Sequence, residues 1–363
     1  MTSLPSDALR SLQSDLSELL EQLPKLTHGK LTYQALATLV RMVDADIERL
    51  DWKIIRSTLQ DLEQAFQVFS PYRHTRKITI FGSSRLLPEA PEYRLAVEFA
   101  QRVAEQGFLV MTGAGGGIME AGNKGAGPDK SFGLNIELPF EQGANAFIAD
   151  DPKLLNFKYF FTRKLFFLRE TDAIALFPGG YGTQDEAFEC LTLTQTGRCP
   201  PMPLVLIDRP GGDYWKDWNA YICKHLIAPG LVSPEDDKLY TITDSLDVAC
   251  QVITDFYRVY HSSRYVGDRL VLRLKKELTE QDVEQLNQSF NDIVLAGEIE
   301  KSQALPEEFR GTQPVPEDLQ GETANLPRLV FRFNQRDHGR LYQLIAEINR
   351  RGAPPTVDGP ERK

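Results

Sequence analysis

Residues 173–186, AIALFPGGYGTQDE, join an apolar run directly to a glycine-rich loop and an acidic segment. The run 173–177 is typical of a strand in the middle of a parallel sheet, covered on both faces. Gly179, Gly180 and Gly182 let the backbone turn sharply and bring its N–H groups close to a ligand. This combination of buried strand and open loop constrains the fold more than any other feature of the sequence.

A helix is expected to follow this loop. Thr183 fits its N-cap, and Glu186 stands three residues later, in the position of a capping box. Unpaired amides and the positive end of the helix dipole would then point the same way, which favours an anion. The loop therefore predicts a phosphate site, and the alternative is an ordinary helix cap after a tight turn.

A second strand, glycine loop and helix pattern occupies residues 108–122. Its glycines are too many and too close together for the GxGxxG dinucleotide fingerprint, and no acidic residue clearly ends the next strand to bind a ribose 2′-hydroxyl. These glycines are Gly113, Gly115, Gly116 and Gly117. The pattern favours a mononucleotide over NAD.

Two adjacent cations, Arg163 and Lys164, stand inside the apolar and aromatic segment 157–169. Most of the rings in this segment are expected in the core, where a charge pair is poorly placed without a partner. An anionic ligand or a carboxylate would supply that partner. The alternative is a salt bridge within the fold.

Strand and helix patterns alternate through the middle of the chain. Strands are expected at 77–82, 108–112, 132–138, 173–177, 203–207 and 239–243, with helices around 95–103, 186–196, 215–226 and 245–260. This alternation predicts an α/β fold over residues 71–262, a doubly wound, mostly parallel, Rossmann-like sheet with right-handed crossovers. Ligands of such sheets bind at strand ends, as at Gly82.

Both ends of the chain fall outside this alternation. Residues 1–70 carry apolar residues at helical spacing in three stretches, which predict a helical extension packed on the main domain or a second subunit. The stretches are 9–23, 36–47 and 52–69. Residues 263–363 predict a small α+β domain with a loose, proline-rich loop at 303–327. Its expected strands are 269–274, 294–299 and 329–333, and its helices 279–290 and 341–348.

Composition narrows the function classes. The chain has 41 basic and 51 acidic side chains, a formal charge of −10, which argues against general binding to nucleic acid. Its four cysteines are widely spaced without a CxxC pair, and the N-terminus lacks a signal segment, which predicts reduced thiols in the cytoplasm. The apolar runs are too short to span a membrane, and the five histidines are too scattered for a histidine-built metal site.

Five segments together resemble the LOG ("Lonely guy") family, whose members are phosphoribohydrolases of nucleoside 5′-monophosphates. They are 82–85 (GSSR), 112–121 (TGAGGGIMEA), 133–139 (GLNIELP), 160–164 (FFTRK) and 178–186 (PGGYGTQDE). The resemblance implies that Arg163 and Glu186 form the catalytic pair. It implies substrate contacts for Gly82, Ser83, Arg85, Gly115, Gly116, Gly117, Glu120, Asn135, Lys164, Gly179, Gly180, Gly182 and Thr183. It also implies a homodimer or higher homo-oligomer, with no metal and no cofactor.

The implied reaction is hydrolysis of the N-glycosidic bond to free base and ribose 5-phosphate. Many short plant-type members carry Gly-Leu-Met-Gly where this chain has GIME at 117–120. AMP or another purine or pyrimidine monophosphate is therefore expected before a cytokinin riboside monophosphate. LOG proteins have often been labelled lysine decarboxylases, but no lysine here suits a Schiff base with pyridoxal phosphate.

Two alternatives remain open at this point. The same fold also serves non-catalytic carriers of nucleotides or of the molybdenum cofactor, although the presence of both Arg163 and Glu186 favours an enzyme. The C-terminal segment either regulates activity through an effector such as a nucleotide, or covers exposed sheet and stabilises the oligomer.

Overall fold

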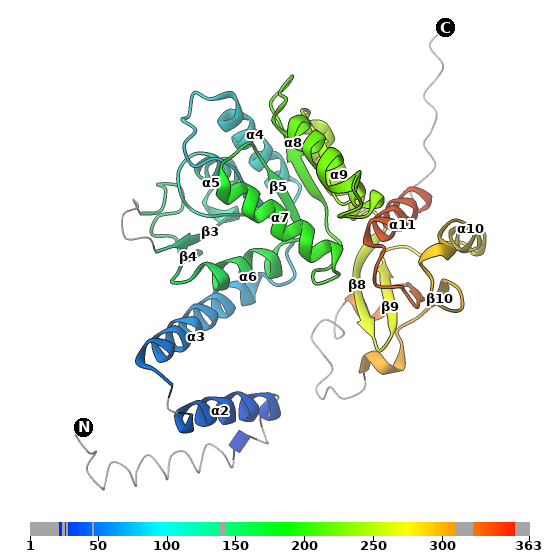
Figure 1. Cartoon of the computed structure of the whole chain (residues 1–363), viewed down its shortest axis with the longest axis horizontal. Coiled ribbons are helices and arrows are strands. Elements are labelled where there is room, and N and C mark those ends of the chain that lie inside the picture. The colour runs from blue at the N-terminus through cyan, green and yellow to red at the C-terminus, as the bar shows by residue number, and fades with distance from the viewer. Residues whose placement is uncertain are drawn as a thin grey trace.

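The computed structural model describes residues 22, 23, 26, 28–45, 47–137, 143–309 and 322–352. These residues form a seven-stranded parallel sheet between two layers of helices, followed by a four-stranded antiparallel sheet with its own helices (Figure 1). The predicted fold class, a doubly wound α/β sheet with a small α+β region, is confirmed. In the described part of the chain, every helix is too short or too polar to cross a membrane.

The order of the strands in the central sheet reverses at its middle. From one edge to the other it contains β4 (Leu154–Phe157), β3 (Ser131–Ile136), β2 (Leu109–Thr112), β1 (Lys77–Phe81), β5 (Ala173–Leu176), β6 (Leu204–Ile207) and β7 (Thr241–Thr243). The chain builds outward from β1 to β4, then returns to place β5 against the other side of β1. Ile78 thus pairs with both Val110 and Ala173. Ligands of open α/β sheets bind where the strand order reverses in this way.

Each face of the sheet has its own apolar core. On one face pack α3 (Arg49–Phe69), α6 (Phe160–Glu170), α7 (Tyr181–Gln195) and α8 (Tyr214–Ile222). On the other pack α4 (Pro91–Glu105), α5 (Ile118–Ala126) and α9 (Leu246–Phe256). Both faces of the strands are therefore covered, which explains why 173–177 reads as an unbroken apolar run.

The N-terminal extension meets the sheet through one of its helices. In α3, Ala65 and Phe69 are buried in the core, and the buried Asp61 accepts hydrogen bonds from Lys158 N at 3.2 Å and Thr162 Oγ1 at 2.5 Å. These bonds hold the start of α6 against α3. In contrast, α2 (Gly29–Asp44) lies away from the sheet and is mostly exposed (Figure 1). The helix expected at 9–23 falls almost entirely outside the described residues.

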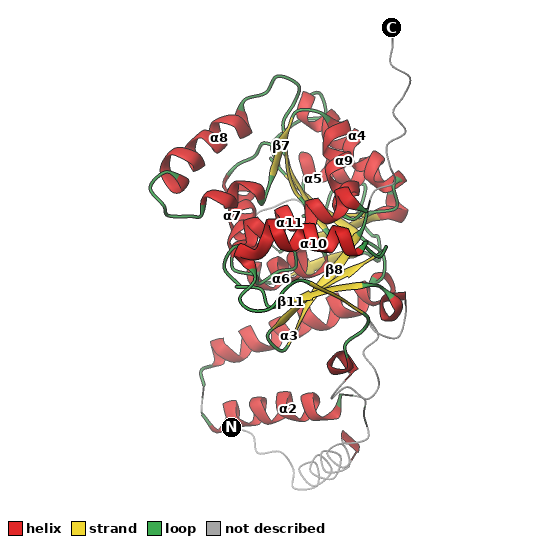
Figure 2. Ribbon diagram, turned by 90° about the vertical axis from the view of Figure 1, so that its right-hand side faces the viewer, coloured by secondary structure: helices red, strands yellow, loops and turns green. Residues whose placement is uncertain are grey.

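The C-terminal sheet has the strand order β10 (Glu300–Ser302), β11 (Arg328–Phe331), β9 (Arg269–Leu274) and β8 (Tyr260–Val266). Helices α10 (Glu280–Phe290) and α11 (His338–Arg351) share one apolar core with it, and Figure 2 shows both in front of its strands. Thr279 caps α10 (Glu280–Phe290), with Asp282 completing the capping box, so the helix predicted at 279–290 is confirmed. Residues 310–321 of the expected loop lie outside the described part.

Several predicted boundaries are wrong. The helix expected at 245–260 ends at Phe256, because Tyr260 starts β8, a strand the sequence did not predict since only its two ends are buried. Residues 294–299 are not a strand: Val294 makes an isolated bridge to Phe333, and Gly297 takes a positive φ of 76°. The small domain therefore runs β-β-α-β-β-α. The helix expected at 215–226 changes to a π-helical turn at Cys223–Ile227.

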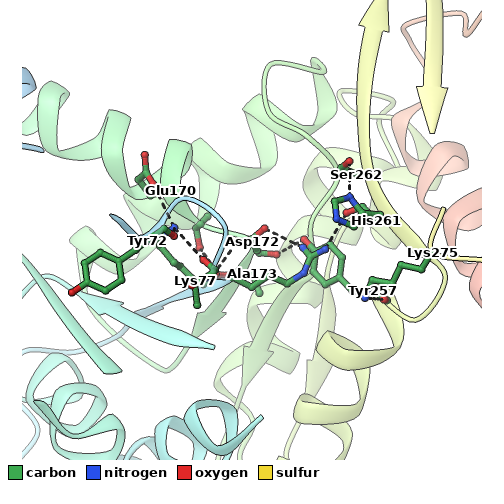
Figure 3. Close-up of polar contacts among 12 residues, drawn as sticks. Tyr72, Lys77, Glu170, Asp172, Ala173, Tyr257, His261, Ser262 and Lys275 are labelled. Carbon is green, nitrogen blue, oxygen red and sulfur yellow. Dashed lines mark hydrogen bonds and ion pairs between the residues drawn. The ribbon is translucent and has the colours of Figure 1, made fainter. Parts of the chain in front are cut away.

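A group of polar contacts joins the C-terminal part to the base of the central sheet (Figure 3). Asp172, which precedes β5, accepts from Lys77 N at 2.9 Å and from Arg76 Nη1 at 3.1 Å. The Tyr257 hydroxyl donates to the Asp172 carbonyl at 2.6 Å, and Arg76 also donates to the His261 carbonyl at 3.1 Å. The Arg76 guanidinium lies 3.6 Å from the centroid of the Tyr257 ring. The start of β8 is thus fixed to the starts of β1 and β5.

Candidate functional site

The candidate site lies where the strand order reverses, at the carboxyl ends of β1 and β5. The loops after these strands touch, because Ser83 N donates to the Pro178 carbonyl at 3.1 Å. The loop after β2 also contacts them, because Ile118 N donates to the Ser83 carbonyl at 3.0 Å. Three segments far apart in the sequence thus form one surface.

The loop at 178–182 leads into α7 one residue after Gly180. The N-cap is Gly180, so the prediction of Thr183 as N-cap and Glu186 as its capping partner is wrong. Thr183 lies in the first turn and faces back toward Gly179, where a Cβ would come within 2.1 Å of its Oγ1. This close approach is possible because residue 179 is glycine.

The start of α7 is open toward solvent. A Cβ built at Gly180 or Gly182 would have no neighbour within 4 Å among the described residues, and both glycines are exposed. The first N–H groups of this 15-residue helix have no carbonyl partner within the helix itself. The geometry suits an approaching anion, because these amides and the positive end of the helix dipole lie together.

Tyr214 holds this loop in place, and the sequence did not predict it. Its hydroxyl donates to the Gly179 carbonyl at 2.6 Å and accepts from Gln184 Nε2 at 2.7 Å. Tyr214 starts α8, on the far side of β6 in the sequence. No local pattern marks such a contact, since it exists only after the sheet has formed.

The second glycine loop is shaped by close packing. Gly117 has a φ of 64°, and a Cβ there would lie 2.2 Å from the Ser83 carbonyl oxygen. A Cβ at Gly82 would come within 2.6 Å of the Ile118 side chain. Gly82 and Gly117 thus allow the loops to nest. Gly115 and Gly116 are partly exposed at the surface that the loops form.

Two buried asparagines fix the same loop from behind. Asn145 Nδ2 donates to the carbonyls of Ala114 and Gly115, each at 3.0 Å, and to Asn123 Oδ1 at 3.0 Å. Asn123 Oδ1 also accepts from Thr112 Oγ1 at 2.7 Å. This network supports Ala114 in its unusual conformation, with a φ of 61°. Neither asparagine was predicted, because each reads as a loop or helix-surface residue in the sequence.

The two cations of α6 face different partners. Lys164 Nζ lies 2.6 Å from Glu189 Oε2, 2.9 Å from Asp185 Oδ2 and 3.9 Å from Glu186 Oε2. The salt-bridge alternative therefore describes Lys164. Arg163 lies over the Phe167 ring, 5.2 Å from its centroid, and its Nη2 is so close to Gly113 that a Cβ there would lie 2.5 Å away. It thereby joins α6 to the second glycine loop.

Only half of the six rings in segment 157–169 are buried, whereas the sequence predicted most of them in the core. Phe157, Phe166 and Phe167 are buried, but Phe160 and Phe161 are more than half exposed. The reason is the helical period of α6, which turns its first residues away from the sheet. These exposed rings border Arg163 on the outer side of the helix.

The acidity of Glu186 is strongly altered by its surroundings. Its side chain is only 13% exposed, and burial raises its pKa to about 7 against the attraction of Lys164. The neighbouring charges of Glu189 and Asp185 also raise its pKa, while Arg163 lowers it. A carboxyl group that titrates near neutral pH can exchange a proton during a reaction.

Other residues that were predicted to contact the substrate form hydrogen bonds within the protein. Glu120 accepts from Tyr93 Oη at 2.7 Å, and Asn135 donates to Asn156 Oδ1 at 3.0 Å. Ser83 Oγ accepts from the backbone N–H of the exposed Arg85 at 3.2 Å. Their positions near the carboxyl edge of the sheet are established, and their contacts with a ligand stay predictions. Across the described ranges, no group of three or more His, Cys, Asp or Glu side chains could hold a metal ion.

One family model matches the chain, described as "Possible lysine decarboxylase", over residues 111–253. This segment contains both glycine loops and the helices α5, α6 and α7. The comparison with curated proteins found no match. The motif-based resemblance to LOG proteins, which have often carried the lysine decarboxylase label, is thus confirmed for the middle of the chain.

Solved structures share only distant likeness with the chain. A protein designated TM1055 is 23% identical, with 49% of this chain and 98% of that one covered and a TM-score of 0.36. The molybdenum cofactor binding protein from the phototrophic bacterium Rippkaea orientalis is 15% identical, with coverage of 50% and 96% and a TM-score of 0.37. The Moco carrier protein from Chlamydomonas reinhardtii is 15% identical, with coverage of 50% and 96% and a TM-score of 0.35. These scores are too low to transfer any property to this chain.

Proposed function

We propose that this chain hydrolyses nucleoside 5′-monophosphates. The proposal starts from the match of residues 111–253 to the possible lysine decarboxylase family, a label that LOG proteins have often carried. Water would add to C1′ of the ribose, the C1′–N bond would break, and free base and ribose 5-phosphate would leave. One observation carries the proposal: the largely buried Glu186, with a pKa of about 7, lies in the same helix that the open glycine-rich loop leads into.

The phosphate would bind at the start of α7. The exposed backbone at Gly180 and Gly182 admits a ligand to the first N–H groups of the helix. Such a site favours a dianionic phosphate without any side-chain charge. Since phosphate binding would provide much of the affinity, the monophosphate should be a far better substrate than the nucleoside.

Glu186 lies about one helical turn from the loop, so that its carboxylate can reach the sugar of a nucleotide held there. Breaking the glycosidic bond builds positive charge on the ribose ring, which a carboxylate stabilises. The same carboxylate can orient the attacking water and accept its proton, as a pKa near neutrality allows. Arg163, bridging α6 and the second glycine loop, would neutralise the phosphate or polarise the substrate.

The lysines do not support a decarboxylase with a Schiff base. Burial alone would lower the pKa of Lys164. Its bonds to Glu189 and Asp185 and the charge of Glu186 outweigh burial and raise the pKa on balance, so the ammonium group stays protonated. A Schiff-base lysine must be neutral to attack a carbonyl. Lys77 is buried, but its ammonium group donates to the carbonyls of Tyr72 and Thr75, at the opposite edge of the sheet from the loops.

The direct test incubates the purified chain with AMP, GMP, CMP, UMP and a cytokinin riboside monophosphate, and measures free base and ribose 5-phosphate. Adenosine is the matched control, because it lacks only the phosphate. Equal turnover of AMP and adenosine would contradict the phosphate assignment.

Variants separate the enzyme from a carrier. Glu186→Gln should remove nearly all turnover and keep nucleotide binding, and Arg163→Ala should weaken both. AMP that binds without being cleaved by the wild type would support a non-catalytic carrier instead.

A further inference from the structure

A cavity of about 440 Å³ lies between the central sheet and the C-terminal part. Its walls come from the starts of β6 and β7, the end of α9 and the outer side of α11, and Figure 1 shows α11 beside α9. Because strand starts line it, the cavity lies at the opposite edge of the sheet from the glycine loops. Ligand sites commonly measure roughly 300–1,000 Å³ and occur at domain interfaces.

The interior of the cavity is apolar and aromatic. Leu204, Leu239 and Tyr342 are buried at its floor, and the half-buried Tyr240 and Phe256 form its walls. The rings of Phe256 and Tyr342 are 5.8 Å apart between centroids. Aromatic walls around an apolar floor suit a flat ring, which gains from both apolar burial and ring stacking.

Two sets of hydrogen bonds hold the cavity open in a fixed shape. The Tyr342 hydroxyl donates to the Met202 carbonyl at 2.9 Å and accepts from Met202 N at 3.0 Å. Asn349 Nδ2 donates to the Phe256 carbonyl at 2.7 Å, and its Oδ1 accepts from Val259 N at 2.7 Å. Since α11 is anchored on both sides of the opening, a ligand would find a preformed site.

Three basic side chains lie at the rim of the cavity. Lys238, Arg258 and Arg350 are exposed there, and Asp255 is the single acidic residue of the lining. Arg350 bonds Glu347 through Nε and Nη2, and Arg258 bonds Asp255 through Nη2, so each guanidinium has further N–H groups. Lys238 is also paired, with Asp237 at 2.8 Å. An anion at this place would therefore bind through the remaining N–H groups of the two guanidiniums rather than through a net positive charge.

We propose that this cavity is a second nucleotide site, separate from the glycine loops. The base would lie against Tyr240 and Phe256, and the phosphate would meet Arg258 and Arg350 at the rim. A nucleoside would lack the contacts with the rim arginines, and inorganic phosphate would lack the contacts with the aromatic walls. The site does not depend on the reaction proposed for Glu186.

The test is calorimetric titration of the full-length Glu186→Gln protein with AMP, with adenosine and inorganic phosphate as partial probes. Two AMP molecules should bind per chain. Ala346→Trp should fill the opening, because Ala346 is exposed on α11 and lines the cavity, and should reduce the number to one. Arg350→Glu should weaken the second site at least tenfold by reversing a rim charge.

Arg336→Glu is the matched control, since Arg336 is exposed in the same part of the chain and does not line the cavity. It should leave both sites unchanged. Unaltered AMP stoichiometry and affinity in both Ala346→Trp and Arg350→Glu would overturn the proposal. So would adenosine binding at the second site as tightly as AMP. Arg350→Glu keeps the test decisive if the tryptophan variant does not fold.

Discussion

Glu186→Gln should stabilise the folded protein above pH 7 while it removes turnover. Burial is the main reason that the pKa of Glu186 rises from an ordinary value of 4.5 to about 7. A carboxyl group with a raised pKa binds its proton more tightly in the folded than in the unfolded chain. Its contribution to stability is therefore complete below pH 4.5 and is lost as the pH rises through 7. Glutamine stays neutral and avoids this loss.

The size of the effect follows from the shift in pKa. Each pKa unit corresponds to about 1.4 kcal/mol, so a rise from 4.5 to about 7 gives about 3 kcal/mol when Glu186 is fully ionised. At pH 5 the same linkage leaves a difference of about 1 kcal/mol. Lys164 keeps Asp185 and Glu189 as partners in the variant, so no unpaired buried cation offsets the gain.

Urea unfolding of the two proteins between pH 5 and pH 8.5, followed by tryptophan fluorescence, measures this difference. The advantage of the glutamine variant should grow by about 2 kcal/mol across that range. Asp185→Asn is the control, because Asp185 is 62% exposed and its removal leaves the buried carboxyl in place. If wild type and Glu186→Gln show parallel stability profiles, Glu186 does not carry the raised pKa.

Three further predictions test the site and the assembly. Lys164→Met should move the midpoint of the pH–rate profile above 7, since Lys164 lowers the pKa of Glu186. An unchanged midpoint would show that ionisation of Glu186 does not control the rate. Gly179→Ala should reduce turnover at least tenfold and lower the melting temperature, because its Cβ would lie 2.1 Å from a side-chain oxygen, whereas Gly180→Ala has room and should keep the fold. Light scattering should show at least a dimer, since α2 exposes apolar residues along most of its length, and a monomer at working concentration would contradict this.

Six of the seven strands of the central sheet could be predicted because their signals are local; the edge strand β4 was missed. Apolar runs mark the buried strands, and glycines mark the loops at their carboxyl ends, so that residues 82 and 179–182 were placed correctly at one edge. Local signals fail for partly exposed strands. The interior of β8 is only half buried, and its sequence YHSSRYV shows no clear alternation. Its partner β9 gave the stronger pattern because it is buried at most positions.

The contacts that give the site its shape could not be predicted. Tyr214, Asn123 and Asn145 support the loops through bonds to residues 11 to 35 positions away in the chain. Nothing near them in the sequence distinguishes them from surface residues. The prediction of Thr183 as N-cap was wrong for a different reason. Threonine suits an N-cap, but the Thr183 side-chain oxygen packs on Gly179, and the helix starts earlier in the sequence. Tertiary packing overrides a capping preference of about 1 kcal/mol.

The site also depends on residues that never approach it. Strands β1 and β5 are short, and each carries a site loop at its carboxyl end. The residues just before them, Arg76 and Asp172, form hydrogen bonds with the C-terminal part. Asp172 bonds the starts of both strands and receives the Tyr257 hydroxyl, as Figure 3 shows. These bonds fix the two strand starts side by side, and a slip between them would displace Ser83 from Pro178. The C-terminal part therefore helps to set the geometry of the loops, even though none of its described residues contributes to them.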